Sequence, residues 1–161
     1  MTPVGAAVER SVRIHVDHLL ETLQGLPREA FNTWKPAAAR EGSHEMNTFA
    51  ALAVHTVSAA EFHALHMVGR KASDRDRDSE FVATATYEDV EARFRTFLAE
   101  LHELLDGMSD ADFGGDPAPD RPDLEGWTNA DWLMHTIDHI ALHTGHLQIQ
   151  RQLWEYESGS A

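Results

Sequence analysis

Four long segments of this chain repeat apolar residues at helical spacing, and no segment alternates apolar and polar residues as a half-buried β-strand does. The clearest repeat lies in the third segment, where the apolar positions are Val90, Phe94, Phe97, Leu98, Leu101 and Leu105. An amphipathic helix of this kind can bury its apolar face only against other elements. The pattern therefore predicts an all-α fold, and four such helices predict a four-helix bundle.

Capping and helix-breaking residues give the expected bounds. Gly25 and Pro27 end the first helix, and Thr48, with Asn47 before it, is a good N-cap for the second. We expect helices over 3–23, 48–69, 87–106 and 128–156, within one domain over 1–157 that is followed by a disordered tail over 158–161.

The connections between these helices differ in character. The first contains Phe31 and Trp34, which we expect to pack beneath the bundle. The charged stretch over 70–86 is expected to be a solvated loop, and 107–127 is broken by proline and glycine. Both later connections are long enough to cross over the bundle, so the helical pattern alone leaves the order of the helices open.

Composition narrows the classes of function. The 161 residues contain 42% hydrophobic residues, as in an ordinary globular domain. The net charge of −14 disfavours binding to nucleic acid. The sequence has no apolar run long enough to predict a membrane span. The chain has no cysteine, which excludes disulfides, zinc–thiolate sites, iron–sulfur clusters and a cysteine nucleophile, and which fits a cytoplasmic protein.

The last helix carries a row of histidines at positions 135, 139, 143 and 146, all within an arc of roughly 80°. We expect this row to run down the middle of the buried face. Apolar residues flank it on both sides. One side carries Leu142, Ile149 and Leu153, and the other carries Leu133, Ile140, Leu147 and Trp154. The polar residues Thr144, Gln148 and Gln152 lie opposite the row. Because a buried polar group without a partner costs about 1–3 kcal/mol, the row needs partners, and a metal ion would satisfy several rings together.

Two pairs in this row, His135/His139 and His139/His143, have the i, i+4 spacing that lets both rings reach one ion. The second helix offers a third ligand, His55, on an inward face surrounded by alanines. The other polar residues of that helix are less suitable. Glu61 lies about 120° around the helix from His55, His66 is too far along it for the same ion, and His63 is expected at the boundary of the buried face.

Three interpretations of the histidines stay open at this point. An ion with free coordination positions would support catalysis, by activating water or a substrate thiolate. A closed site, with His146 or Glu61 as a fourth ligand, would indicate a non-catalytic bundle that binds metal or a small apolar ligand. The row could also be hydrogen-bonded without metal. Di-iron chemistry is excluded, because its Glu-x-x-His motif occurs only at Glu41/His44, in a connection.

Three segments resemble the DinB/YfiT-like family of metal-binding four-helix bundles. The stretch from His139 to Leu147, HIALHTGHL, is similar to the family's H-x-x-x-H-x-G-Q signature. The segments GLPREAFNTWKP and LAVHTVSAAEFH are similar to its first connection and its second helix, so the resemblance spans about 19–154. His146 replaces the usual Gln, His63 stands where Trp is common, and the interval from His55 to Glu61 is one residue longer than the family pattern.

The resemblance implies more than the residues do by themselves. It implies a metal triad of His55, His139 and His143 that binds a divalent ion, foremost nickel or zinc, with manganese or iron as further options. It implies up-down-down-up helix order with a long crossover after the second helix, and a homodimer. Related bundles act on small molecules, as S-transferases that use a low-molecular-weight thiol, and we also consider a hydrolase. His146 and His135 are the candidates for supporting a metal ligand or transferring protons.

Overall fold

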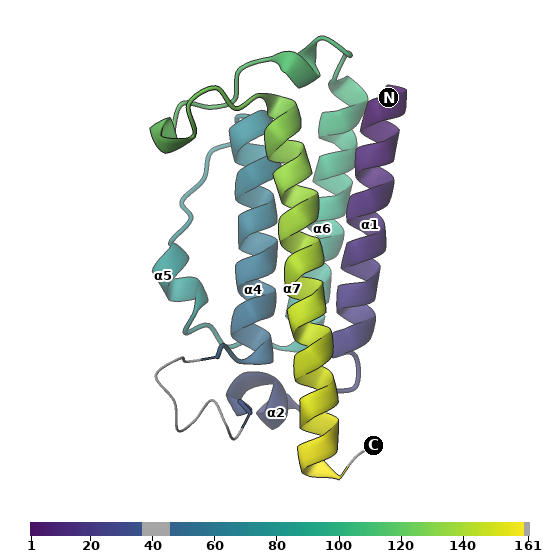
Figure 1. The fold of residues 1–161 in the computed structure, drawn as a ribbon, viewed down its shortest axis with the longest axis vertical. Helices are drawn as coiled ribbons and strands as arrows, with labels where there is room; N and C mark the ends of the chain where they lie inside the picture. The colour runs from purple at the N-terminus through teal and green to yellow at the C-terminus, as the bar shows by residue number, and fades with distance from the viewer. Residues whose placement is uncertain (37–45, 160–161) are drawn as a thin grey trace.

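The computed structural model describes residues 1–36 and 46–159, and its described elements are all helices. The long elements run the length of the molecule (Figure 1): α1 (Pro3–Leu23), α4 (Phe49–Ala60) continued by the π-helix η1 (Glu61–Val68), α6 (Tyr87–Gly107) and α7 (Asn129–Ser158). The short elements are α2 (Arg28–Thr33), α5 (Arg77–Glu80), η2 (Asp112–Gly114) and η3 (Pro122–Leu124). The predicted all-α four-helix bundle is confirmed.

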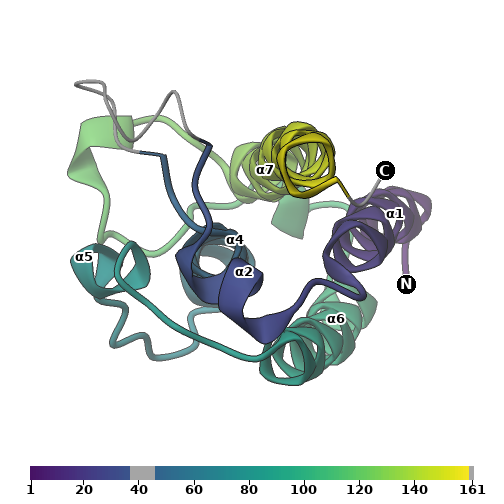
Figure 2. The same cartoon turned by 90° about the horizontal axis from the view of Figure 1, so that it is seen from below.

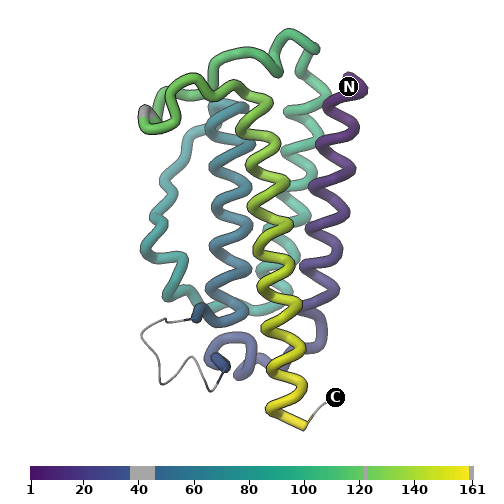
Figure 3. Tube along the Cα trace, viewed as in Figure 1, coloured from purple at the N-terminus to yellow at the C-terminus, as the bar shows by residue number. Residues whose placement is uncertain are grey.

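The order of the helices is also the expected one. The chain trace in Figure 3 shows α1 and α7 running in one direction and α4 and α6 in the other. Residues 70–86, which include α5, return along the outside of the bundle from the end of η1 to the start of α6 (Figures 1 and 2). The fold is therefore up-down-down-up, with the long crossover after the second long helix.

A threonine side chain caps the first turn of every long helix in the described chain. The hydroxyl oxygens of Thr2, Thr48, Thr86 and Thr128 each accept a hydrogen bond from a backbone N–H three residues later. This satisfies one of the N–H groups that a helix start leaves without a partner, and it fixes where the helix begins. The predicted starts at Thr48 and Thr128 are confirmed.

The connection after α1 closes one end of the bundle, as Figure 2 shows for α2 beneath α4. Phe31 is 2% exposed, and the ring of Trp34 stacks on Phe49 with centroids 5.7 Å apart, so both aromatic side chains pack as expected. Glu41 and His44 lie outside the described residues, as do residues 160–161 of the expected tail. At the other end of the chain, α7 continues through Ser158 and ends at Gly159, which is left-handed.

The π-helix η1 was not predicted. Its backbone bonds span five residues instead of four, so it winds more slowly than an α-helix. Each residue after Glu61 therefore rotates about the helix axis by a smaller angle than it would in an α-helix. As a result, His63 lies closer to the face that carries His55. This explains why His63, expected at the boundary, is in fact buried, with 5% of its surface exposed.

The expected burial of α7 was wrong in one respect. Leu142, Ile149 and Leu153 are exposed by 56%, 59% and 39%, whereas Thr144 is buried, so the histidine row lies at one edge of the buried face. The polar threonine is buried because its hydroxyl donates a hydrogen bond back to the Ile140 carbonyl, at 2.8 Å, and so needs no water. Within the described ranges, no helix is both long and apolar enough to traverse a bilayer.

Candidate metal centre

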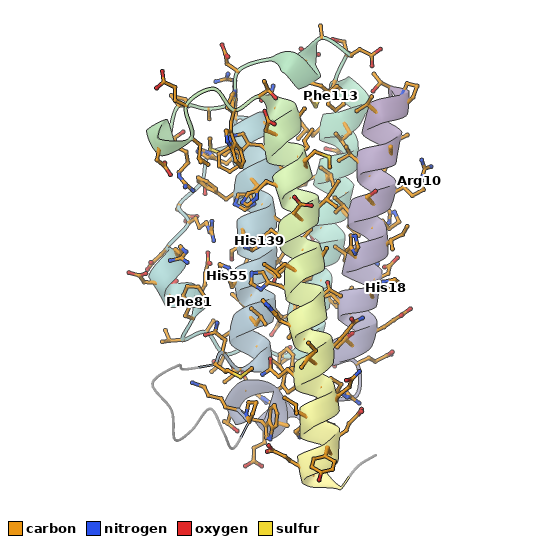
Figure 4. The ribbon with its side chains drawn as sticks, in the orientation of Figure 1. Arg10, His18, His55, Phe81, Phe113 and His139 are labelled. Carbon is orange, nitrogen blue, oxygen red and sulfur yellow. The ribbon has the colours of Figure 1, made fainter. Side chains whose placement is uncertain are left out.

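Three histidines from two helices meet between α4 and α7. His55 comes from the middle of α4, while His139 and His143 are one turn apart on α7, so antiparallel packing of the two helices brings them to one level. Figure 4 shows His55 and His139 pointing toward one another across this gap. One ring nitrogen from each of the three lies within 4.8 Å of the others, and Nε2 of His139 is 3.2 Å from Nε2 of His143. This cluster could hold a metal ion.

The separation between His139 and His143 fits a shared ion. Metal–nitrogen bonds of 2.0–2.1 Å place two imidazole nitrogens on one ion roughly 2.8–3.4 Å apart, for angles between 90° and tetrahedral. The 3.2 Å between His139 and His143 lies in that interval. Three imidazoles suit zinc, nickel, copper and iron alike, so the donor set fits a divalent transition metal without selecting one.

Burial keeps the three rings in the form that can bind metal. Burial and the neighbouring imidazoles lower the pKa of His139 to about 3 and that of His143 to about 4. Burial also lowers the pKa of His55, although its hydrogen bond to Glu80 opposes the shift. All three rings are therefore neutral at pH 7, so an ion need not displace protons from them.

A carboxylate contacts the Nδ1 side of His55, and the sequence did not predict this contact. Glu80, at the end of α5, is only 4% exposed, and its Oε2 lies 2.7 Å from Nδ1 of His55. The guanidinium of Arg75 donates to both carboxylate oxygens of Glu80, at 2.7 and 3.0 Å. The expectation that 70–86 is a solvated loop was therefore wrong here, since a carboxylate that pairs with a guanidinium and accepts a hydrogen bond from an imidazole can be buried. Nothing in the charge pattern distinguished Glu80 from its exposed acidic neighbours.

The two histidines considered for proton transfer lie at opposite ends of the cluster. His146 is exposed, and its Nδ1 is 3.4 Å from Nδ1 of His143, so it reaches the ring on the side away from His139. His135 is half-buried and approaches the cluster through ring contacts, 6.0 Å from His139 and 4.6 Å from His63 between centroids. The structure thus brings both histidines next to a triad member, with ring centroids 5.5 Å apart for His146 and His143 and 6.0 Å apart for His135 and His139.

His63 extends the row of rings on the side toward the start of α7. Its ring centroid is 5.3 Å from those of both His139 and Trp132, and burial lowers its pKa to about 2. Its Nδ1 is buried and has no hydrogen-bond partner among the described residues, and the same holds for Nδ1 of His139. The π-helical turn places this polar ring in an aromatic environment, and α-helical geometry would not have indicated this.

Glu61 and His66, the other possible ligands considered on the second helix, have partners away from the triad. The carboxylate of Glu61 pairs with the guanidinium of Arg93, whose Nε donates at 2.9 Å. His66 makes contacts with the Lys71 carbonyl and Asp120. Both residues line a pocket of about 480 Å³ between η1, α6 and the crossover, which does not include the triad. The sequence-based preference for His55 over these two agrees with the geometry.

No fourth ligand joins the cluster in the described part of the chain. The possible ligands there whose donor atoms lie within 4.8 Å of one another are three histidines, with no carboxylate among them. Glu80 contacts the Nδ1 side of His55, and His146 the Nδ1 side of His143, so neither competes for the space between the rings. A three-histidine set leaves coordination positions for water or substrate, which is the arrangement of catalytic metal sites.

Fold and site together define a class: a four-helix bundle with one candidate three-histidine metal centre between its second and fourth long helices. The DinB superfamily matches residues 12–147, and the chain belongs to this superfamily. A crystal structure of a conserved protein from Enterococcus faecalis is similar in fold, with a TM-score of 0.70 and 15% identity over 95% of this chain and 98% of that one. No curated protein matches the sequence.

Proposed function

We propose that the protein binds one divalent metal ion through His55, His139 and His143 and uses it as an enzyme on a small-molecule substrate. The observation that carries this proposal is the open donor set: three neutral imidazoles converge, and no fourth ligand from the described residues joins them. A metal that served only for stability would be expected in a closed, four-ligand site. Nickel and zinc are the ions we expect foremost, with manganese and iron as further options.

An ion held here would supply Lewis acidity, which activates water or a thiol for attack on an electrophile. The residues of the chain then divide into two tasks. The triad holds the ion, and His146 is the proton carrier, because it is exposed and adjacent to His143. His135 is the alternative proton carrier from the other end of the row. The resulting reaction classes are transfer of a group to a low-molecular-weight thiol and hydrolysis.

We also propose that the protein is a homodimer. Support comes from Leu142, Ile149 and Leu153, which are exposed and lie within roughly 40° of one another on α7. An exposed apolar row on a helix can pack against the same row of a second copy around a two-fold axis.

Elemental analysis tests the metal proposal. Protein purified without chelator, or reconstituted with nickel or zinc, should carry about one ion per chain. His139→Ala should lose it, since this ring is one of the three proposed ligands. The matched control is His102→Ala, which removes an exposed histidine on α6 whose Nδ1 lies 3.2 Å from the carboxylate of Glu9. No bound metal, together with no thermal shift on adding nickel, zinc or manganese, would refute the proposal.

If metal binds, a screen of low-molecular-weight thiols with electrophiles, with and without the ion, separates transferase from hydrolase activity.

A further inference from the structure

Glu80 is the one buried carboxylate in the described part of the chain, and it comes from a segment of charged residues that otherwise face solvent. Its four preceding residues, Asp76, Arg77, Asp78 and Ser79, are all exposed. Taking a carboxylate out of water costs several kcal/mol unless charged and hydrogen-bonded partners replace the water. Arg75 and His55 are these partners, so burial of Glu80 depends on both contacts.

The contact with His55 fixes which nitrogen of that ring is available. An ionised carboxylate can only accept, so Nδ1 of His55 must carry the proton and donate it to Glu80 at 2.7 Å. Nε2 is then the free nitrogen. The ring of Phe81 lies against the same imidazole, with centroids 4.7 Å apart, so two consecutive residues of the crossover hold His55.

The other two triad members have no such support. Nδ1 of His139 has no partner among the described residues, and Nδ1 of His143 faces His146 at 3.4 Å. His139 and His143 share one helix, so their relative position is set by α7 itself. His55 comes from another helix, and its orientation toward them depends on what fixes its ring.

We propose that Glu80, held by Arg75, is a positioning residue that locks His55 with Nε2 toward His139 and His143 and thereby strengthens metal binding. A ligand histidine that donates its second nitrogen to a carboxylate is oriented, and its electron pair is made more basic. Arg75 donates to both carboxylate oxygens, which keeps Glu80 ionised and fixes the position of its carboxylate beside His55. The crossover thus belongs to the metal site although it provides no ligand. This inference rests on the proposed metal binding.

The first test does not need metal. In long-range ¹H–¹⁵N spectra of the metal-free protein, His55 should be the Nδ1–H tautomer, with a slowly exchanging Nδ1 proton. Glu80→Gln, which keeps the size of the side chain and an acceptor oxygen, should retain this tautomer. Glu80→Ala should lose the slow exchange and populate the Nε2–H form. A parent protein whose His55 is already Nε2–H would overturn the proposal.

The second test is metal affinity, measured by competition with a chromophoric chelator for zinc. Glu80→Ala should weaken binding about 10–100-fold, the usual effect of removing such a partner, and Glu80→Gln less. Arg75→Met should also weaken binding, because Glu80 loses its second partner. The matched control is Asp78→Ala, which removes an exposed carboxylate from the same helix and should bind zinc like the parent.

The outcomes separate the two proposals. If the parent binds zinc and both Glu80 variants bind it equally well, the positioning role is refuted while the metal site stands. If His55 shows the expected tautomer but the parent binds no metal, the metal proposal fails and the Glu80–His55 contact is only structural. If Glu80→Ala does not fold, Glu80→Gln provides the deciding comparison. Zinc affinity equal to that of the parent, together with an unchanged spectrum of bound cobalt(II), would contradict a contribution of the carboxylate charge to metal binding.

Discussion

Acid should destabilise the metal-free protein through His63, and replacing this residue should remove part of the effect. In the folded protein, burial lowers the pKa of His63 from 6.5 to about 2, whereas in the unfolded chain the ring has its ordinary pKa. Above pH 6.5 the ring is neutral in both states and adds no pH dependence. As the pH falls below 6.5, only the unfolded chain takes up the proton, so the free energy of unfolding falls and continues to fall toward pH 2.

The magnitude at pH 5.5 follows from the unfolded pKa alone, because the folded pKa lies far lower. A ring with a pKa of 6.5 binds its proton with a gain of about 1.4 kcal/mol at one pH unit below that value. Between pH 7.5 and 5.5, the parent should therefore lose about 1.4 kcal/mol more than His63→Phe, a variant of similar shape that cannot be protonated.

Urea unfolding in the presence of EDTA, followed by circular dichroism at both pH values, measures this difference. His18→Gln removes an exposed histidine from α1 and serves as the control, which should follow the parent. At pH 7.5, His63→Phe should be at least as stable as the parent, because Nδ1 of His63 is buried without a partner among the described residues. An equal loss of stability in His63→Phe and the parent would refute the view that His63 is neutral and buried.

Three further predictions concern metal affinity, the core and self-association. Since burial lowers the pKa of all three triad histidines, the zinc dissociation constant should change less than about twofold between pH 7.5 and 6.5 in a competition assay, whereas three ordinary histidines would give about sixfold. Ile140→Ala, at a fully buried position, should cost about 2–5 kcal/mol in urea unfolding, against less than about 1 kcal/mol for Met134→Ala, which is 53% exposed; equal costs would contradict the burial of α7. Light scattering after size exclusion should find a dimer, and Ile149→Glu should convert it to a monomer while the exposed Gln148→Glu does not; a monomeric parent would refute the homodimer.

The long helices could be predicted because their signals are local. Threonine N-caps at Thr48 and Thr128 and the apolar repeat of α6 depend on neighbouring residues only, and the structure begins the helices where these signals place them. The order of the helices did not follow from this pattern, because both later connections were long enough to cross the bundle. The resemblance to the DinB/YfiT-like family supplied that order.

The details of the site depended on contacts that are distant in sequence. Spacing identified His139 and His143 as a possible pair, but the burial of Thr144 and the exposure of Leu142 depend on where α1 packs against α7 and on a hydroxyl bonding to its own helix. The inward turn of His63 depends on a π-helix that periodicity does not indicate. Glu80 reaches His55 across 25 positions, and only the path of the crossover brings them together.

The central claim is that three histidines from two helices bind one ion, and anomalous diffraction from crystals grown with zinc tests it most directly. Data collected on both sides of the zinc absorption edge should give one strong peak per chain, about 2.0–2.1 Å from a ring nitrogen of His55, His139 and His143, with at least one coordination position not filled by protein. A peak held by other residues, or no peak at this site at saturating zinc, would contradict the account.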